Sequence, residues 1–280
     1  MLSSDLDLSC RLERAEGHAS YRFAEARRRL SPESGADWMQ LPGAYAVFDG
    51  VDSPVTQAFG LGLFEPLRPK TLDIVEKFFF DRGAPVLLEM SPFAGVSAAQ
   101  LLCDRGYRPV EISNVMARRV GAPAASTSKS VKVRVTGADE ADLWNDVSTR
   151  GWSHELPQLA EFLRDMGKIN AGRDGSVCFL AELDGTPGAA GMLCLHENVA
   201  LFGGAATVPE MRRRGLQTAL FDARMRYAAD QGCDLAMVVV EPGSASQRNA
   251  ERNGFQIAYT RTKWRLDTTR EKRETRSKKP

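Results

Sequence analysis

The sequence predicts an α/β chain of two related halves, each with a mixed, mostly antiparallel sheet flanked by helices. Three observations support this fold class. The same order of helix, strand, Ser-x-x-Gln and Gly signals occurs twice, half a chain length apart. Each half places several strands before one helix crossover, which differs from the regular βαβ alternation of dinucleotide-binding folds. The polar segment GAPAASTSKS at residues 121–130 lies between the halves and is typical of a linker.

The second half begins with helical patterns and continues with three β-prone runs. Asp184-Gly185 and Glu197-Asn198 separate these runs and favour tight hairpin turns. The expected helices cover residues 138–148 and 156–168, and the expected strands cover residues 176–183, 188–196 and 199–207.

Both halves end with the same succession of signals. A helix ends, an apolar strand follows, a Ser-x-x-Gln capping box begins the next helix, and a Gly ends that helix before the last strand. The box consists of Ser97 and Gln100 in the first half, and of Ser244 and Gln247 in the second. A tandem duplication is the simplest explanation, with a helix at residues 12–30 opening the first copy.

The composition is that of an ordinary globular protein and excludes several classes of function. Of 280 residues, 43% are hydrophobic and 26% are charged, with a formal net charge of +1. This balance gives no general attraction to nucleic acid or to an acidic membrane. The exception is a basic tail at residues 267–280, which we interpret as a solvated end because no aromatic residue follows Trp264.

The cysteines and the N-terminus indicate a reducing compartment. The five cysteines are scattered, odd in number and lack paired metal-ligand spacing, so we expect reduced thiols and no metal site. Acidic residues in the first segment argue against a secretory signal, and no apolar run reaches the length of a membrane span. We therefore expect a cytoplasmic protein without a membrane partner.

Residues 208–220, VPEMRRRGLQTAL, have the pattern of a strand-to-helix turn that holds a pyrophosphate. A helix N-terminus offers unpaired N–H groups and the positive end of the helix dipole. Gly215 permits close approach of the backbone, while Arg212, Arg213 and Arg214 add positive potential. An ordinary solvated basic turn would have the same composition, so the flanking segments decide between these readings.

The turn and its flanks resemble the GCN5-related N-acetyltransferase (GNAT) superfamily, whose loop reads Arg/Gln-x-x-Gly-x-Gly/Ala. Arg212 and Gly215 match this pattern, whereas Gln217 departs from it at the last position. Residues 241–255, which end in Asn-Gly-Phe, resemble the end of the superfamily's fifth strand and the helix after it. The resemblance covers residues 131–266 well and residues 1–120 only as a degenerate copy, which implies two tandem GNAT-like domains.

The resemblance implies that acetyl-CoA binds where the fourth and fifth strands separate. Its pantetheine arm would lie in the gap, and paired glycines at Gly203-Gly204 suit a bulge in the fourth strand. The residues expected to contact acetyl-CoA are Thr207, Val208, Arg212, Arg213, Arg214, Gly215, Leu216, Gln217, Thr218, Ser246 and Asn249.

Acetyl transfer to an amine requires a base, a donor to the thioester carbonyl and often an acid for the thiolate. The resemblance implies that the backbone N–H of Val208 is the carbonyl donor. Glu241, His154 and Glu155 are the candidate bases. Many GNAT members have a tyrosine that acts as the general acid where this chain has Ala250. The thiolate could therefore leave without a general acid at that position.

The first half lacks the phosphate-binding turn. Its equivalent segment, FEPLRPKT at residues 64–71, has two prolines and no glycine, so we expect coenzyme to bind only to the second half. The sequence thus predicts an acetyl-CoA-dependent N-acetyltransferase whose acceptor is a primary amine on a small molecule or peptide. A non-catalytic acyl-CoA sensor is the alternative. Nucleic-acid binding through the tail ranks last, and the sequence leaves a homodimer open.

Overall fold

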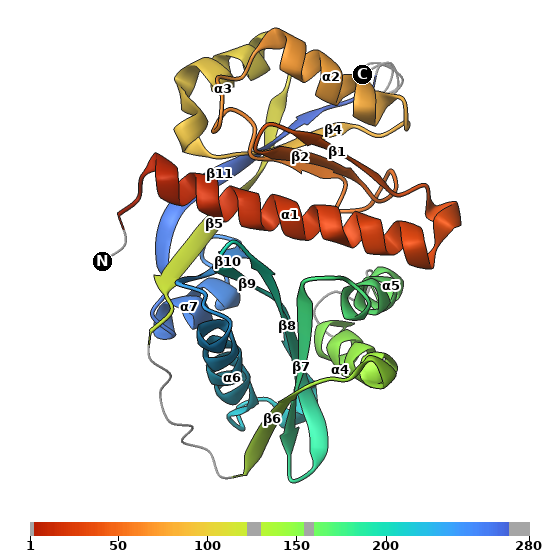
Figure 1. Ribbon diagram of the computed structural model, residues 1–280, viewed down its shortest axis with the longest axis vertical. Coiled ribbons are helices and arrows are strands. Elements are labelled where there is room, and N and C mark those ends of the chain that lie inside the picture. Colours follow the sequence, from red (N-terminus) through yellow and green to blue (C-terminus); the bar gives the residue numbers. More distant parts are fainter. Residues whose placement is uncertain (1–2, 122–129, 154–159, 269–280) are drawn as a thin grey trace, which may run out of the picture. The chain divides into compact units, whose positions relative to one another are not determined.

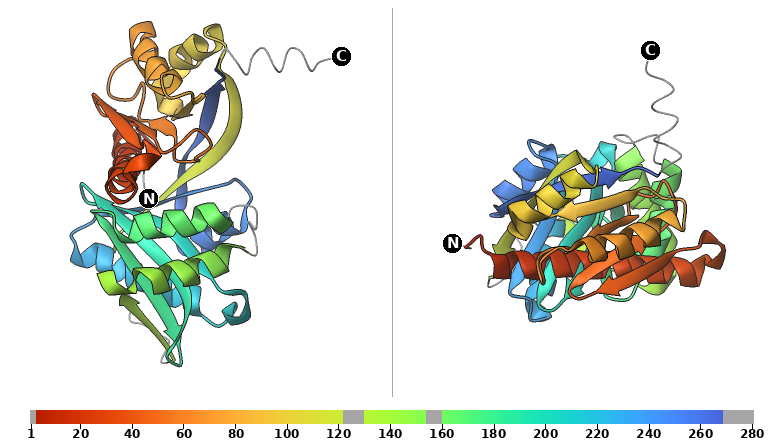
Figure 2. Two further views of the ribbon diagram at one scale, coloured as in Figure 1. Left: turned by 90° about the vertical axis from the view of Figure 1, so that its right-hand side faces the viewer. Right: turned by 90° about the horizontal axis from the view of Figure 1, so that it is seen from above.

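The computed structural model describes residues 3–121, 130–153 and 160–268 (Figures 1 and 2). Its contacts divide the chain into two units. The first unit comprises Met1–Ala117 together with Val239–Pro280, and the second comprises Arg118–Val238. Both units combine helices with a mostly antiparallel sheet, which confirms the predicted α/β fold class.

Six strands form the sheet of the first unit, in the spatial order β1-β2-β3-β4-β11-β5. Neighbouring strands are antiparallel except for β3 and β4, which are parallel. The strands are β1 (Asp37–Leu41), β2 (Ala44–Phe48), β3 (Gln57–Phe59), β4 (Val86–Met90), β5 (Arg108–Arg119) and β11 (Gln256–Leu266).

Strand β11 comes from the second half of the sequence but lies in the sheet of the first unit (Figure 1, blue). It pairs with β4 on one side, from Thr262 opposite Met90 to Leu266 opposite Val86. On its other side it pairs with β5. The contact units therefore differ from the two halves of the sequence, because the last strand of the second half completes the sheet of the first.

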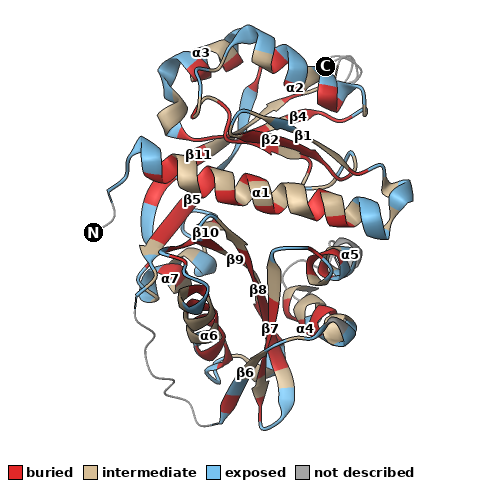
Figure 3. Cartoon of the chain, in the orientation of Figure 1, coloured by how far each residue is buried: buried red, intermediate tan, exposed pale blue. Residues whose placement is uncertain are grey.

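The helices of the first unit are α1 (Leu6–Leu30), α2 (Pro69–Phe80), α3 (Gly95–Asp104) and α7 (Ala245–Arg252). Helix α1 begins before the predicted residue 12 because Asp5 caps it: the side chain of Asp5 accepts a hydrogen bond from the Leu8 amide. Helices α2 and α3 contribute Leu72, Val75, Phe79 and Leu102 to a core that they share with β2 and β4. Figure 3 shows the buried positions of these elements in red.

The structure confirms the serine N-cap of one predicted capping box, although its glutamine binds the preceding residue, and it corrects the other box. Ser244 caps α7 by accepting from the Gln247 amide at 3.1 Å, while the Gln247 side chain accepts from Gly243. Ser97 instead lies inside α3, so its prediction as an N-cap was wrong. Ser91 takes that role, since its hydroxyl accepts from Phe93 at the start of a short 3-10 turn that leads into α3.

The sheet of the second unit has the order β10-β9-β8-β7-β6, antiparallel except between β10 and β9. Its elements are β6 (Val131–Val135), α4 (Ala141–Ser153), α5 (Ala160–Ala171), β7 (Ser176–Leu183), β8 (Thr186–His196), β9 (Val199–Thr207), α6 (Leu216–Asp230) and β10 (Leu235–Val240). Asp184-Gly185 and Glu197-Asn198 all have positive φ, which confirms the two predicted tight turns.

Three predictions from the sequence concern a membrane span, a metal site and the state of the cysteines. None of the described helices combines the length and hydrophobicity that crossing a bilayer requires. Within the same residues, His, Cys, Asp and Glu form no group arranged to hold a metal ion. All five cysteines have free thiols. The predicted linker and basic tail lie almost entirely outside the described residues.

Candidate functional site

The segment between β9 and α6 forms the predicted strand-to-helix turn. Strand β9 ends at Thr207, and Pro209–Met211 make one 3-10 turn. Arg213 and Gly215 then have φ of 60° and 83°, in the left-handed region. Only glycine adopts this conformation at little cost, so Gly215 is what allows the chain to turn directly into α6 at Leu216.

The N-terminus of α6 is open to a ligand. No side chain caps the helix. The first helical bond runs from Ala219 to the Gly215 carbonyl, which leaves the amides of Leu216, Gln217 and Thr218 without partners inside the helix. A Cβ placed on Gly215 would have nothing within 4 Å, so the space beside this residue is open.

The three arginines of the turn differ in what they contact. The guanidinium of Arg212 is turned back into the unit, where it donates to the carbonyls of Thr207 at 3.3 Å and Gly151 at 3.2 Å. Arg213 and Arg214 are exposed and make no contact that holds them elsewhere in the described structure. Arg212 therefore shapes the turn, and its contact with a phosphate stays a prediction, while the other two are available as free cations.

Thr207 and Val208 lie at the end of β9 and are buried. The hydroxyl of Thr207 has no hydrogen-bond partner among the described residues, which is unusual for a buried polar atom and fits a contact with a ligand. The Val208 amide behaves differently: it donates to the Gly188 carbonyl at 3.0 Å, because the β8–β9 pairing continues past Thr207. The amide expected to hold the acyl carbonyl is thus engaged.

Strands β9 and β10 pair only at their beginnings. Their parallel pairing runs from Leu235 opposite Val199 to Met237 opposite Leu201 and ends there. The rest of β9, as far as Thr207, pairs with β8 alone within the described residues. The two strands therefore diverge at the end that leads into the turn, which is the separation expected for a pantetheine arm.

A bulge interrupts the β8–β9 pairing at the predicted glycine pair. The register shifts by one residue between Ala190 and Met192, and Gly204 has φ of 57°. Two buried side chains bind carbonyls of β8 at this point. Trp144 of α4 donates to Gly191 at 3.3 Å, and Arg224 of α6 donates to Met192 at 3.4 Å.

Arg224 is a buried cation that sequence reasoning did not identify. Its guanidinium lies 4.7 Å from the centre of the Phe202 ring and binds only backbone carbonyls in the described contacts. Burial lowers the pKa of this guanidinium to about 9. No pattern in the sequence distinguishes Arg224 from a surface arginine of α6, because its role depends on a bulge in two distant strands.

The remaining candidate residues lie elsewhere. Glu241, Ser246 and Asn249 belong to the first unit, so their participation with the turn stays a prediction. Glu241 is exposed and directly follows β10, and Ser246 is exposed on α7. His154 and Glu155 lie outside the described residues.

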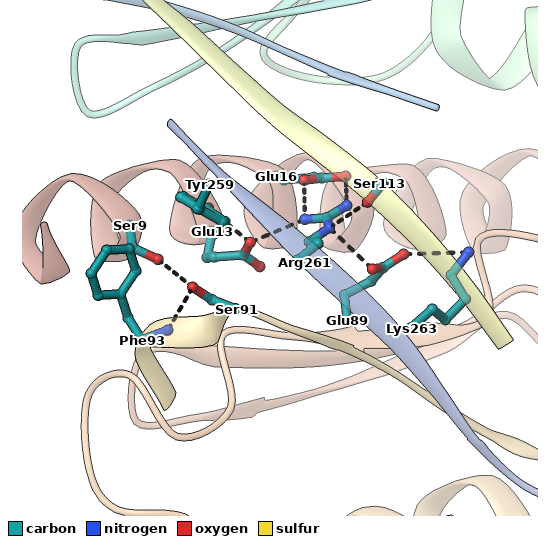
Figure 4. Close-up of polar contacts among 10 residues, drawn as sticks. All are labelled: Ser9, Glu13, Glu16, Glu89, Ser91, Phe93, Ser113, Tyr259, Arg261 and Lys263. Carbon is teal, nitrogen blue, oxygen red and sulfur yellow. Dashed lines mark hydrogen bonds and ion pairs between the residues drawn. The ribbon is translucent and has the colours of Figure 1, made fainter. Parts of the chain in front are cut away.

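The first unit contains a buried ionic cluster centred on Arg261 of β11 (Figure 4). Arg261 is 2% exposed and binds two carboxylates of α1, with contacts of 3.1 Å to Glu13 and 2.6 Å to Glu16. It also pairs with Glu89 of β4 at 3.0 Å and donates to Ser113 of β5 at 3.2 Å. One guanidinium thus joins three strands and a helix.

Burial perturbs the acids of this cluster. It raises the pKa of Glu13 to about 7, although Arg261 opposes the shift, and it also raises the pKa of Glu89. Tyr259, whose hydroxyl donates to Glu13 at 2.9 Å, has its pKa raised by burial as well. No motif predicted this cluster, since its members come from four segments spread over the chain.

The segment of the first unit that corresponds to the turn is filled by protein. Phe64 packs against Gly43 so closely that a Cβ there would lie 2.1 Å from the ring. The cavity beside it, lined by Gly60, Leu61 and Pro66 among others, holds about 10 Å³, the space of one water molecule. Coenzyme binding by the second half alone stays a prediction, and this filling favours it.

The chain is similar to acetyltransferases. The model of the acetyltransferase (GNAT) family matches residues 140–255. A GCN5-related N-acetyltransferase from Kribbella flavida superposes with a TM-score of 0.62 at 18% identity, over 88% of this chain and 95% of that chain. One from Sphaerobacter thermophilus gives a TM-score of 0.52 at 19% identity, over 80% and 78%.

One solved structure is similar to this chain over both of its halves. A tandem GNAT protein from the clavulanic acid biosynthesis pathway superposes with a TM-score of 0.56 at 14% identity, over 95% of this chain and 96% of that chain. No curated protein sequence matches the chain. At these identities the solved structures establish the fold alone. Residues 140–255 of this chain are similar to the acetyltransferase (GNAT) family, and the fold of the chain is similar to that of the tandem GNAT protein.

Proposed function

We propose that this chain transfers an acetyl group from acetyl-CoA to a primary amine. The observation that carries the proposal is the open N-terminus of α6 at the point where β9 and β10 diverge. A helix N-terminus binds a phosphate through its amides and dipole, and a gap between strands accommodates an extended arm. The two features together suit a ligand with a pyrophosphate at one end and a long chain at the other.

The residues present fit coenzyme A at three points. The amides of Leu216 and Thr218 would hold the pyrophosphate at the start of α6, with Arg213 and Arg214 adding charge around it. The Thr207 hydroxyl, which lacks a partner among the described residues, would bind a polar group of the pantetheine arm.

Acetyl-CoA supplies an acetyl thioester, and the chain's own residues position the amine and move its protons. The acceptor ammonium first loses one proton, and we assign Glu241 as its recipient. The C–N bond then forms as the C–S bond breaks. The second nitrogen proton passes to the departing thiolate, so the products are the amide, free coenzyme A and one proton released to solvent.

Ala250, at the position where many GNAT members have a tyrosine, is buried in α7 and has no acidic group. We therefore propose that the thiolate leaves without assistance from that position. The same feature, together with the engaged Val208 amide, favours the second candidate function, a non-catalytic acyl-CoA sensor.

Two further features of the proposal concern the first half and the compartment. The first half, residues 1–120, would act as a structural partner without coenzyme, because Phe64 and its neighbours fill the corresponding segment. The free thiols suit a reducing compartment such as the cytoplasm.

Calorimetry with acetyl-CoA tests the binding step, and release of free thiol in the presence of amines tests the transfer. We expect micromolar binding that weakens at least tenfold when Arg213 and Arg214 are both replaced by Ala, with an unchanged melting temperature. Arg248 and Arg252 of α7, replaced together by Ala, are the matched control. Absence of binding to the wild-type chain would refute the proposal. Binding without thiol release across a broad amine panel would favour the sensor.

A further inference from the structure

The first unit contains an open groove of about 960 Å³ that the coenzyme site does not use. Residues 109–113 of β5 form one wall, and residues 239–242, at the end of β10 and just after it, form the other. All of these residues belong to the first unit. A groove of this size accommodates a small organic molecule.

One wall of the groove is unusually apolar for an exposed strand. Val110 is 46% exposed and Ile112 is 54% exposed, although both are large hydrophobic side chains on β5. Val239 and Val240 extend the apolar lining on the opposite wall. Exposed apolar residues gathered in a concave site, rather than scattered singly, are typical of ligand binding.

The charged residues of the lining are both acidic. Glu111 and Glu241 line the groove, and its lining residues, all of them described, include neither Lys nor Arg. Glu111 is 2.7 Å from Lys263, which also contacts Glu89 at 3.3 Å. The carboxylate of Glu241 has no hydrogen bond or ion pair within the described structure and is exposed, so it is the one free to receive a cation.

The wall of the groove is anchored to the buried ionic cluster behind it. Ser113, a lining residue, binds Arg261, and Glu111 binds Lys263, so the wall is continuous with the cluster of Figure 4. The negative charge at the groove itself comes from Glu111 and Glu241, and carboxylates in a groove attract cations and repel anions.

The segment that carries Glu241 is held in place. Gly243 donates to the Gln247 side chain at 2.7 Å, and Asn114 of β5 donates to the same oxygen at 3.2 Å. The Ser244 amide also donates a hydrogen bond to the Glu241 carbonyl at 3.2 Å. Gln247 thus ties the turn after Glu241 to the strand that forms the opposite wall, which keeps the groove preorganised.

We infer that this groove binds a primary amine with an apolar body, such as an arylalkyl or alkyl amine. The ammonium pairs with Glu241, and the apolar body lies along Val110 and Ile112. The inference rests on the proposed function, because an acetyltransferase of the proposed kind requires a primary amine as its acceptor. Anionic acceptors, such as phosphorylated amines and acidic amino acids, are disfavoured.

Binding of amines to the full chain tests the inference without relying on activity. Saturation-transfer NMR and calorimetry would compare 2-phenylethylamine and hexylamine with ethanolamine and glutamate. We expect the apolar amines to bind at least tenfold more tightly than ethanolamine, and glutamate not to bind. Equal affinities for phenylethylamine and ethanolamine would overturn the assignment.

Substitutions on the apolar wall locate the amine. Ile112→Lys places a cation in the groove and should weaken phenylethylamine binding at least tenfold, while the affinity for acetyl-CoA stays unchanged. Val96→Lys is the matched control, since Val96 is 85% exposed on α3 and does not line the groove. Unchanged phenylethylamine affinity in Ile112→Lys would exclude this wall as the site of the apolar body.

Turnover measurements distinguish an error in the acceptor class from an error in the proposed acetyltransferase activity. Acetylation of ethanolamine or amino sugars with kcat/KM equal to or above that of phenylethylamine would refute the apolar acceptor while the acetyltransferase stands. Absence of acetyl-CoA binding would refute the proposed function, and weaker phenylethylamine binding by Ile112→Lys would still support the groove. Glu241→Gln should lower kcat/KM for phenylethylamine at least tenfold, and an unchanged kcat/KM would remove Glu241 as proton acceptor.

Discussion

The hydroxyl of Tyr259 donates a hydrogen bond of 2.9 Å to the carboxylate of Glu13, although 246 residues separate them in the sequence. Both side chains are buried. The contact joins the first helix of the chain to its last strand, so the N-terminal and C-terminal segments stabilise each other within one unit. The interactions around it therefore offer direct tests of how the first unit is held together.

Replacing Tyr259 by Phe should destabilise the protein by about 1–2 kcal/mol, because the buried Glu13 oxygen loses one of its two donors and keeps only Arg261. The aromatic ring itself remains packed edge-on against Phe93, so the volume of the core hardly changes. Tyr21→Phe is the control, since the hydroxyl of Tyr21 makes only a half-buried contact of 3.5 Å with Glu25. Thermal unfolding of both variants measures the difference, and equal melting temperatures would contradict the role assigned to the Tyr259 hydroxyl.

The raised pKa of Glu13 predicts how stability depends on pH. Burial raises this pKa to about 7 from an ordinary value of 4.5. Between these values the folded protein holds a proton that the unfolded chain releases, so the contribution of Glu13 to stability is complete below pH 4.5 and is lost as the pH rises to 7. Glu13→Gln keeps an acceptor for Tyr259 but does not titrate.

We therefore expect the melting temperature of Glu13→Gln to fall less between pH 5 and pH 8 than that of the wild type. The raised pKa of Glu89 leaves part of the decline in place, because its sign is the same. Asp267→Asn, at a residue that pairs with Arg108 and Arg265 outside the cluster, is the control and should retain the decline of the wild type. An equal decline in Glu13→Gln and the wild type would show that Glu13 is ionised throughout this range.

Removing the central cation of the cluster should be costly. Arg261→Met leaves Glu13, Glu16 and Glu89 buried without their shared partner, and we expect a loss of about 3–5 kcal/mol in the free energy of unfolding. Arg108→Met breaks only the exposed pair with Asp267 and should cost less than about 1 kcal/mol. Denaturant unfolding compares the two, and similar midpoints would mean that the carboxylates accept protons at little cost.

The sequence predicted the elements whose signals are local. Asp184-Gly185 and Glu197-Asn198 determine hairpins through their own backbone preferences, and Gly215 marks the turn into α6 because few residues tolerate its φ. The glycine pair likewise predicted the bulge of β9. In each case the residue itself carries the physical cause.

The features that sequence reasoning missed depend on which distant segments meet. The pattern of β11 indicates a strand but not its neighbours, so its place between β4 and β5 could not be predicted. Ser97 matched a capping box, yet Ser91 and Pro92 started the preceding turn first. The Val208 amide looked free because its acceptor, Gly188, lies on another strand. The same holds for Arg224, which binds a carbonyl of β8.

Gly215 provides the sharpest test of the coenzyme turn. Gly215→Ala introduces a Cβ at a φ of 83°, which we expect to cost about 1–2 kcal/mol of stability and to narrow the approach of a phosphate to the amides of α6. Gly232→Ala is a matched control, because Gly232 follows the other end of the same helix with φ of 75° and also has nothing within 4 Å of its Cβ position. Both variants should lower the melting temperature to a similar extent, whereas only Gly215→Ala should weaken acetyl-CoA binding, by at least tenfold in calorimetry. Equal affinities in the two variants would mean that the pyrophosphate does not approach the backbone at this turn.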